Sequence, residues 1–256
     1  MFKKKLFEGK TALVTGGGTG IGLEISRQFL DLGAKVFIAS RKTEKLEAAV
    51  LKLHGNGNNL MAYRLDIREP ENISHLADFI AQHTDKLDIL VNNAGGQFPS
   101  AAENITEKGW RAVVDTNLNG TWFLTQALAK RFFLKQKQSN IVNIVLNNFR
   151  GFPGMAHSAA ARAGVMNLSK TLAVEWVKHG VIINCVAPGI IESTGLENYP
   201  PDMLKGIADK IPMRRLGTVQ EVAELVLFLA HSRYISGETI YIDGAQRLWG
   251  DIWDLN

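Results

Sequence analysis

Cysteine is almost absent from this chain. Cys185 is the only cysteine among 256 residues, so no disulfide can form within the chain. It lies in the apolar run 181–187, a pattern typical of a buried, inert thiol in a reducing compartment. We therefore expect Cys185 to be a core residue and not a nucleophile.

Long hydrophobic runs are also absent. No window holds the roughly 18 uninterrupted apolar residues that a membrane-spanning helix needs. The lysines at positions 3–5 are not followed by the apolar stretch of a signal peptide, and the last three residues are not a Ser-Lys-Leu peroxisomal address. We expect a cytoplasmic protein that does not enter a membrane.

Charge of either sign is in small excess only. The formal net charge is +4, and no basic stripe with interleaved aromatic residues indicates a nucleic-acid surface. No metal site is expected either. The length of 256 residues suits one α/β domain, and no repeat, low-complexity tract or linker divides it. We therefore treat residues 1–256 as a single domain.

Strand-like and helix-like runs alternate along nearly the whole chain, which predicts a parallel sheet covered by helices on both faces. We expect seven strands, at 11–14, 35–39, 60–65, 87–91, 141–145, 181–187 and 239–242. The longest helices are expected at 107–135 and 154–179, and both are long enough to pack between subunits. The fold class is α/β, a doubly wound Rossmann-type domain, and we expect a homo-oligomer, either a dimer or a tetramer.

A glycine-rich turn at 15–22 joins the first strand to the first helix. Apolar residues continue from it at helical spacing: Ile21, Ile25, Phe29 and Leu32. Glycines let a backbone approach a ligand, and a helix N-terminus offers free N–H groups and partial positive charge to a phosphate. The turn therefore predicts a pyrophosphate site. Its contacts are expected at Gly16, Gly18, Thr19, Gly20 and Ile21.

The end of the second strand indicates which dinucleotide binds. An acidic residue at this point usually holds the ribose hydroxyls of NAD, whereas a nearby arginine accommodates the 2′-phosphate of NADP. No acidic residue occurs between positions 35 and 43, and Ser40 and Arg41 stand at the strand end. We therefore expect NADP(H). The alternative is a solvated basic turn before a helix.

Further motifs stand at the ends of later strands, where open parallel sheets bind ligands. Asp66 follows the third strand, 92–95 (Asn-Asn-Ala-Gly) follows the fourth, and Asn117 and 186–189 (Val-Ala-Pro-Gly) come later. With the glycine turn, these motifs in this order resemble the short-chain dehydrogenase/reductase family over nearly the whole chain.

The resemblance implies a set of cofactor contacts. Asp66 is expected to meet the adenine amino group, and Asn92 to help fix the adenosine side. Pro188, Gly189 and Ile191 are expected along the nicotinamide, with Ser193 near the phosphates. The same motifs add Ala94 and Gly95 to the cofactor-binding residues. A mobile lid usually follows the Pro-Gly pair in this family, which makes residues from about 190 to 215 the expected substrate loop.

The chain departs from the family at its proton-transfer group. Common members use Ser, Tyr and Lys, the last two spaced Tyr-x-x-x-Lys; here Ser158 and Arg162 stand at those positions, and the usual Ser falls on Val145 or Leu146. A serine hydroxyl is too weakly acidic to replace a tuned phenol, and arginine is never a proton donor in practice. Arg162 can still hold the cofactor. We therefore do not expect an ordinary alcohol or ketone dehydrogenase.

A second resemblance fits these changes. Residues 93–98, 108–110, 151–153 and 157–165 are similar to the enoyl-thioester reductases of the family, the branch of peroxisomal trans-2-enoyl-CoA reductase and 2,4-dienoyl-CoA reductases. Dienoyl enzymes also carry Ser at the Tyr position and take their tyrosine from the loop after the fifth strand, but 147–149 (Asn-Asn-Phe) has none. The resemblance implies hydride transfer from NADPH to the β-carbon of an acyl-CoA.

Several side chains are candidates for the rest of that chemistry. Developing charge on the thioester oxygen needs a hydrogen-bond donor, for which Ser158, Gln97 and Asn147 are the candidates. Tyr199, in the substrate loop, is the candidate acid, and His157 is a second proton source. Asn117 is expected to shape the catalytic region.

Plainer interpretations stay open. Tyr199 can be a loop-packing aromatic, Gln97 a turn residue and His157 a helix-packing residue, while Ser158 can simply make room for substrate. Two other functions also stay open: a dehydrogenase of terpenoid alcohols or aldehydes, and a non-catalytic NADP-binding sensor or assembly protein.

Overall fold

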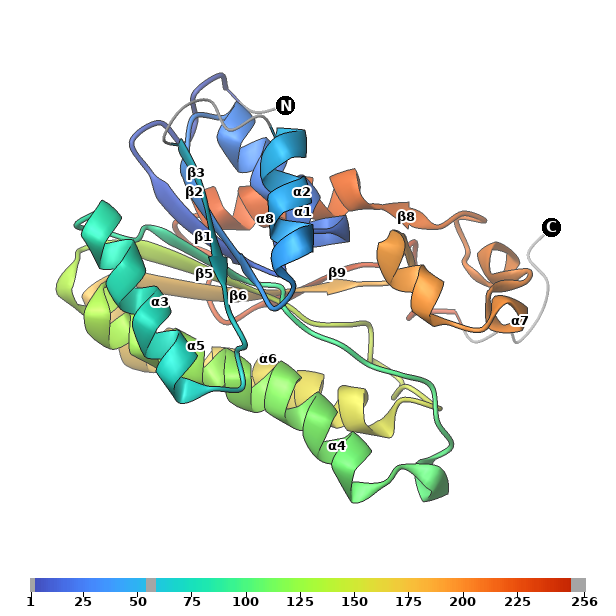
Figure 1. Cartoon of the computed structure of the whole chain (residues 1–256). Helices are drawn as coiled ribbons and strands as arrows, with labels where there is room; N and C mark the ends of the chain where they lie inside the picture. The colour runs from blue at the N-terminus through green and yellow to red at the C-terminus, as the bar shows by residue number, and fades with distance from the viewer. Residues whose placement is uncertain (1–2, 54–58, 250–256) are drawn as a thin grey trace.

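The chain folds around a seven-stranded parallel sheet, and the computed structural model describes residues 3–53 and 59–249 (Figure 1). All seven expected strands are confirmed, with several ends shifted by one or two residues. The strands are β1 (Thr11–Thr15), β2 (Lys35–Ser40), β3 (Leu60–Arg64), β4 (Ile89–Asn92), β5 (Ser139–Ile144), β6 (Val181–Pro188) and β9 (Thr239–Ile242).

The strand order is β3-β2-β1-β4-β5-β6-β9. From β1 to β3 each new strand is added on one side of β1, and from β4 onward each is added on the other side. The strand order therefore reverses between the neighbouring strands β1 and β4. In open parallel sheets the ligand binds at such a reversal, outside the carboxyl ends of the strands. This confirms the doubly wound Rossmann-type α/β fold and directs attention to the loops after β1 and β4.

Helices cover both faces of the sheet (Figure 1). Buried residues of the sheet pack on α1, α2 and α8 in one apolar cluster and on α3, α5 and α6 in another. The helices are α1 (Gly20–Asp31), α2 (Thr43–Leu53), α3 (Pro70–His83), α4 (Glu107–Val114), α5 (Gly120–Arg131), α6 (Ala156–Trp176), α7 (Pro201–Leu204) and α8 (Val219–His231). None of the described helices is long and apolar enough to cross a bilayer.

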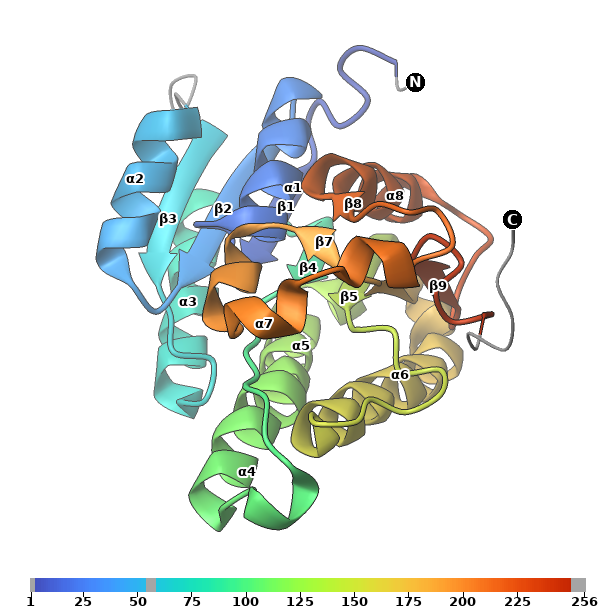
Figure 2. The same ribbon diagram turned by 90° about the vertical axis from the view of Figure 1, so that its right-hand side faces the viewer.

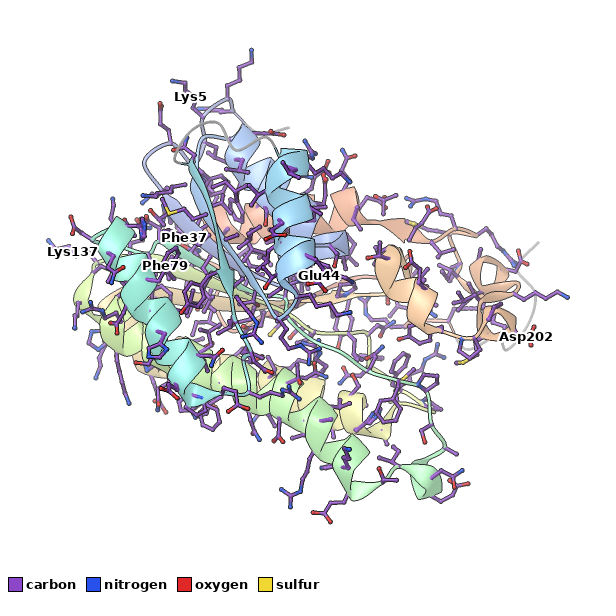
Figure 3. The ribbon with its side chains drawn as sticks, in the orientation of Figure 1. Lys5, Phe37, Glu44, Phe79, Lys137 and Asp202 are labelled. Carbon is purple, nitrogen blue, oxygen red and sulfur yellow. The ribbon has the colours of Figure 1, made fainter. Side chains whose placement is uncertain are left out.

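Alternation along the strands divides the buried side chains between these two clusters. On β2, Val36 and Ile38 face α1 and α2, whereas Phe37 faces the opposite layer. There the Phe37 ring meets the edge of Phe79 on α3 with 6.0 Å between ring centroids (Figure 3). Burying a side chain of this size contributes roughly 1.5–3 kcal/mol. Such contacts hold the helices rigidly on the sheet beneath the loops.

The expected helix at 107–135 is interrupted. A π-helical turn at Asp115–Asn119 separates α4 from α5, because its hydrogen bonds close over a wider turn than those of an α-helix. Single π-turns are frequent at functional sites. This one buries the side chain of Asn117 completely. Sequence periodicity contains no signal for the interruption.

The substrate loop expected at about 190–215 is more ordered than a plain loop. It contains β7 (Ile191–Glu192) and the short α7, and it ends where β8 (Gly217–Thr218) pairs with β7. Figure 2, which faces the carboxyl ends of the strands, shows α7 and the following segment in front of β4 and β5. This segment therefore covers the edge of the sheet at which a ligand is expected.

Candidate active site

The glycine turn has the geometry of a phosphate cradle. Gly16 and Gly20 have positive φ values of 66° and 53°, which side chains other than glycine rarely adopt. A Cβ at Gly22 would overlap the carbonyl oxygen of Gly16, so the turn is packed as tightly as backbone allows. Thr19 caps α1 without a side-chain hydrogen bond, so the first N–H groups of the helix keep their capacity to donate to a phosphate.

The loop after β4 is fastened to this turn. Thr15 Oγ1 accepts hydrogen bonds from the amides of Asn93 (3.0 Å) and Ala94 (2.9 Å). The side-chain amide of Asn93 in turn donates to the carbonyl oxygen of Thr15 at 2.9 Å. The two loops on either side of the strand reversal thus form one unit. Asn93 was not among the expected cofactor residues.

The Asn92 side chain does not join these two loops but lies on the α5 side of the sheet. The side chain is buried and donates to Thr125 Oγ1 (2.9 Å) and to Asn143 Oδ1 (2.8 Å), between the sheet and α5. Asn92 Oδ1 has no partner among the described residues. The alternation that points Leu90 toward α5 also points Asn92 there, and this signal is present in the sequence. A direct contact of the Asn92 side chain with adenosine stays a prediction.

Ser40, Arg41 and Asp66 come together where the sequence motifs lead us to expect adenosine. The amide of Leu65 donates to the carbonyl oxygen of Ser40 at 2.9 Å, so the residues that follow β2 and β3 are neighbours. Asp66 accepts two hydrogen bonds from Arg68, at 2.9 Å from Nε and 2.5 Å from Nη2. This pairing lowers the pKa of Asp66 and keeps the carboxylate ionised. Arg68 is not among the residues expected at the site, although its position two residues after Asp66 in the sequence could have indicated an ion pair with that carboxylate.

Arg162 and Asn117 enclose the Gly95-Gly96 turn. Asn117 Oδ1 accepts from the Gly96 amide (3.0 Å) and Asn117 Nδ2 donates to its carbonyl (2.8 Å). A Cβ at Gly95 would overlap Nη2 of Arg162, so only glycine fits beside this guanidinium. Arg162 Nη1 donates to the Ile144 carbonyl at 2.7 Å. Asn117 therefore fixes the conformation of the Gly95-Gly96 turn.

Arg162 carries an unpaired positive charge. Burial lowers its pKa to about 10, which leaves it cationic at neutral pH. No carboxylate within residues 3–53 and 59–249 forms an ion pair with it. A cation without a carboxylate, next to a glycine turn, suits an anionic or hydroxyl-rich ligand such as a phosphorylated ribose.

Three of the expected catalytic side chains form one hydrogen-bonded chain. Ser158 is fully buried, and its hydroxyl donates to Gln97 Oε1 at 2.6 Å. Gln97 Nε2 donates to the hydroxyl oxygen of Tyr199, in a very short contact. Since the Tyr199 oxygen accepts this bond, its own hydrogen stays available for another acceptor. The substrate loop is thereby tied to α6 through the loop after β4.

The second proton source, His157, and the third candidate donor to the thioester oxygen, Asn147, face other partners. His157 is fully buried against the Phe98 ring, at 4.5 Å between centroids, and its Nδ1 accepts from the Ser158 amide at 2.8 Å. Its Nε2 has no partner among the described residues. Asn147 Nδ2 donates to Asp243 Oδ2 at 3.0 Å, which ties up one of its two N–H groups. Neither side chain joins the Ser158 chain.

The segment after β6 closes the site. Ile191 is buried in β7, while Gly189 packs on Asp243, whose Cα would be 2.8 Å from a Cβ at position 189. Ser193 passes over the glycine turn, 3.7 Å from a Cβ built at Gly20. Ser193 therefore lies directly beside the glycine turn. No three His, Cys, Asp or Glu side chains of the described chain converge to hold a metal ion.

A family model described as "Enoyl-(Acyl carrier protein) reductase" matches residues 16–245. The chain belongs to the short-chain dehydrogenase/reductase family, whose members are oxidoreductases that bind nicotinamide cofactors. The resemblance drawn from the sequence motifs is confirmed. The tight glycine cradle, the uncapped start of α1 and the unpaired Arg162 fit such a cofactor.

Three similar proteins illustrate the range of the family. A Bacillus subtilis protein named a "probable 2,4-dienoyl-CoA reductase" is 36% identical, and the match covers 94% of this chain and 98% of that protein. A Thermotoga maritima 3-oxoacyl-acyl-carrier-protein reductase is 34% identical, over 93% and 97% of the two chains. The solved structure of a citronellol catabolism dehydrogenase from Pseudomonas aeruginosa has a TM-score of 0.87 and 36% identity, over 96% and 98%.

Proposed function

We propose that this protein is an NADP(H)-dependent reductase of the C=C bond of a trans-2-enoyl-CoA or a similar conjugated thioester. The observation that carries the proposal is the hydrogen-bonded chain Ser158–Gln97–Tyr199, which presents a phenol from the substrate loop. The Bacillus subtilis relative, named for dienoyl-CoA reduction, supports this substrate class.

Different residues serve different steps of the proposed reaction. When bound, NADPH would supply a hydride for the β-carbon of the thioester, and negative charge would then develop on the thioester oxygen and the α-carbon. Tyr199 then gives its proton to the α-carbon, and Gln97, held by Ser158, aims the phenol. A proton donor positioned in this way is worth typically 10²–10⁴-fold in rate. Asn117 fixes the Gly95-Gly96 turn through its two hydrogen bonds to the Gly96 backbone.

The position of the glycine turn suggests which residues would bind each part of the cofactor. The pyrophosphate would be bound by Gly16, Gly18, Thr19, Gly20 and Ile21. Arg162 would hold the nicotinamide ribose beside Ala94 and Gly95, and Pro188, Gly189, Ile191 and Ser193 would line the nicotinamide and the phosphates. Asp66 and Asn92 stay proposed for the adenosine side. Arg41, exposed next to Ser40, provides the cation for a 2′-phosphate, which is why we propose NADP(H) over NAD(H).

We also propose a homo-oligomer, a dimer or a tetramer. Phe123 on α5 and Val174 and Val177 at the end of α6 are large apolar side chains exposed to solvent. Large apolar side chains left exposed on a helix are candidates for a protein–protein contact. A second copy of this chain is the proposed partner, and the sedimentation coefficient of the purified protein measures it.

A second function has its own support. The solved structure of a citronellol catabolism dehydrogenase is 36% identical to this chain, so a terpenoid alcohol or aldehyde is the alternative substrate. A third possibility, a cofactor-binding sensor without catalysis, rests on Ser158 and Arg162 standing where Tyr and Lys are usual.

One substrate panel separates these functions. The protein is mixed with NADPH and either crotonyl-CoA or a longer 2-enoyl-CoA, or with NADP and citronellol, and the nicotinamide absorbance is followed. Oxidation of NADPH by enoyl thioesters without turnover of the alcohol supports the proposal. Turnover of the alcohol alone supports the second function. Cofactor binding, seen as NADPH fluorescence, with no turnover of either substrate supports the third.

A further inference from the structure

The carboxylate of Asp243, the residue that follows β9, is buried and accepts four hydrogen bonds. Only 2% of its side chain is exposed. The backbone amides of Ala245 and Arg247 donate to it at 3.1 and 3.0 Å, and Arg247 Nη1 donates at 3.2 Å. The fourth donor is Asn147 Nδ2, at 3.0 Å, from the loop after β5 and 96 residues away in the sequence. Because a buried carboxylate that loses a donor is left incompletely satisfied, these groups hold one another in place.

Hydrogen bonds close a circuit around Pro188 and Gly189, two of the residues proposed to line the nicotinamide. The amide of Asn147 donates to the Pro188 carbonyl at 3.1 Å. The amide of Gly189 donates to the Ile242 carbonyl at 2.9 Å. The bond from Asn147 Nδ2 to Asp243, the residue after Ile242, completes the circuit. This circuit, here called the Asp243 clamp, joins the carboxyl ends of β5, β6 and β9, which are neighbours in the sheet.

Packing makes the clamp stiff where β6 meets β9. A Cβ built at Gly189 would lie 2.8 Å from Asp243 Cα and 2.9 Å from Asp243 Cβ, so only glycine fits at this contact. Closely packed groups of this kind transmit a displacement to their neighbours. A shift of Asp243 would therefore be passed directly to Gly189.

Arg162, the cation proposed for the nicotinamide ribose, lies next to the same strand ends. Its Nη1 donates to the carbonyl of Ile144, the last residue of β5, at 2.7 Å. The amide of Val145 donates to the carbonyl of Val186 at 2.8 Å, two residues before Pro188. The clamp therefore stands beside the groups that are proposed to hold the nicotinamide half of the cofactor.

We propose that Asp243 is a positioning residue: through Asn147 and Gly189 it fixes the segment that lines the nicotinamide ring. The inference rests on the proposed function, because it assigns a support to Pro188 and Gly189 of the proposed cofactor site. It does not depend on whether the substrate is a thioester or an alcohol. Loss of the bond between Asp243 and Asn147 loosens this segment, while the adenosine and pyrophosphate contacts stay as they are.

The test compares the dissociation constants of NADPH and of ADP-ribose 2′-phosphate, which is NADP without its nicotinamide ring, by titration calorimetry. The parent should bind NADPH more tightly than the fragment. Asn147→Asp keeps the shape of the side chain but turns a carboxylate toward Asp243, and Asp243→Asn removes the acceptor. Each should weaken NADPH binding about tenfold, the scale of a hydrogen bond to a charged group, and change fragment binding by less than about twofold.

The double variant Asn147→Asp with Asp243→Asn restores a donor and an acceptor with their roles exchanged. Its NADPH affinity should recover at least about threefold over that of either single variant, as expected for two groups in direct contact. Arg247→Met is the matched control, because Arg247 bonds the same carboxylate but is not part of the clamp. It should keep the parent's ratio of the two dissociation constants.

Several results would overturn the positioning role. They are equal affinities of the parent for NADPH and the fragment, an unchanged ratio in Asn147→Asp, a double variant no better than the single ones, or a ratio that falls as far in Arg247→Met. If Asp243→Asn does not fold, as judged by circular dichroism, Asn147→Asp and Arg247→Met decide the question alone. A parent that binds no NADPH would instead remove the proposed cofactor, and turnover of enoyl thioesters reports separately on the proposed reaction.

Discussion

The hydroxyl of Ser158 donates a 2.6 Å hydrogen bond to the side-chain oxygen of Gln97, although 61 residues separate them. This bond fixes the direction of the next one. With its oxygen occupied as an acceptor, Gln97 turns its N–H group toward Tyr199. The amide therefore acts as a spacer that presents a phenol where a serine hydroxyl alone would be too weakly acidic.

Loss of the phenol hydroxyl should affect turnover and not cofactor binding. We expect Tyr199→Phe to lower kcat by roughly 10² or more, because the phenol proposed to donate the proton is lost. Ser158→Ala should have a smaller effect, of roughly fivefold, since it removes one supporting hydrogen bond worth about 1 kcal/mol. NADPH affinity, measured by fluorescence titration, should stay close to the parent in both.

Tyr234→Phe is the control for this pair, because Tyr234 is fully exposed at the far end of α8. It should leave kcat unchanged. If Tyr199→Phe and Ser158→Ala turn over like the parent, neither hydroxyl handles the proton.

Replacing the amide of Gln97 by a carboxylate tests the direction of the hydrogen bonds that join Ser158, Gln97 and Tyr199. A carboxylate at position 97 can only accept hydrogen bonds, so in Gln97→Glu the Tyr199 hydroxyl would donate to it and be lost to the substrate. We expect low kcat at neutral pH and partial recovery as pH falls toward the usual pKa of Glu, about 4.3, where the protonated acid donates again. The parent should show no such rise. A pH–kcat profile parallel to that of the parent would contradict the proposed chain.

Arg41 should decide the cofactor preference. We expect Arg41→Asp to weaken NADPH binding by roughly 10–100-fold, because a charge-assisted hydrogen bond to the 2′-phosphate is lost. NADH binding should improve, because an acidic residue there can accept from the ribose hydroxyls. The ratio of the two dissociation constants is the measurement. Lys42→Asp, at the neighbouring exposed position, is the comparison that separates a specific contact from a change of overall charge, and an unchanged ratio in Arg41→Asp would refute the assignment.

The start of α8 offers a prediction about stability. Glu221 and Thr218 form a capping box, and Arg215 pairs with the same carboxylate, which lowers the pKa of Glu221 to about 2. A carboxyl whose folded-state pKa is lowered stabilises the fold above its unfolded pKa, and this contribution disappears as pH falls toward 2.

We therefore expect Glu221→Gln to reduce the free energy of unfolding by about 1 kcal/mol at pH 7, a value limited by solvent screening at this exposed site. Urea unfolding at pH 7 and near pH 2 measures the difference. It should nearly vanish at the lower pH. Equal differences at the two pH values would show that the carboxylate charge is not the cause.

The glycine turn of the proposed cofactor site could be predicted from the sequence because its signals are local. The glycine turn stands between one strand and one helix, and the strand end at Arg41 is read from a few neighbouring residues. The contacts between the side chains proposed to handle the proton could not be predicted in this way. Gln97, Ser158 and Tyr199 are each visible as candidates, but only the folded chain brings them into contact across 61 and 102 residues.

Two further features differ in how far the sequence predicts them. The π-turn that buries Asn117 has no periodic signature, because one wider turn changes little in the spacing of apolar residues. The placement of the Asn92 and Asn93 side chains is a different case. Strand alternation assigns Asn92 to the α5 side, so the contact of Asn93 with Thr15 was open to prediction from β4 alone.

The most direct measurement follows the hydride itself. NADPH carrying deuterium at the transferable position is reacted with crotonyl-CoA, and the butanoyl-CoA product is analysed by mass spectrometry and NMR. Enoyl reduction predicts one deuterium at the β-carbon, with the α-carbon taking its proton from solvent-exchangeable groups. Deuterium on a carbinol carbon of a reduced aldehyde or ketone, with none delivered to the β-carbon of crotonyl-CoA, would contradict it.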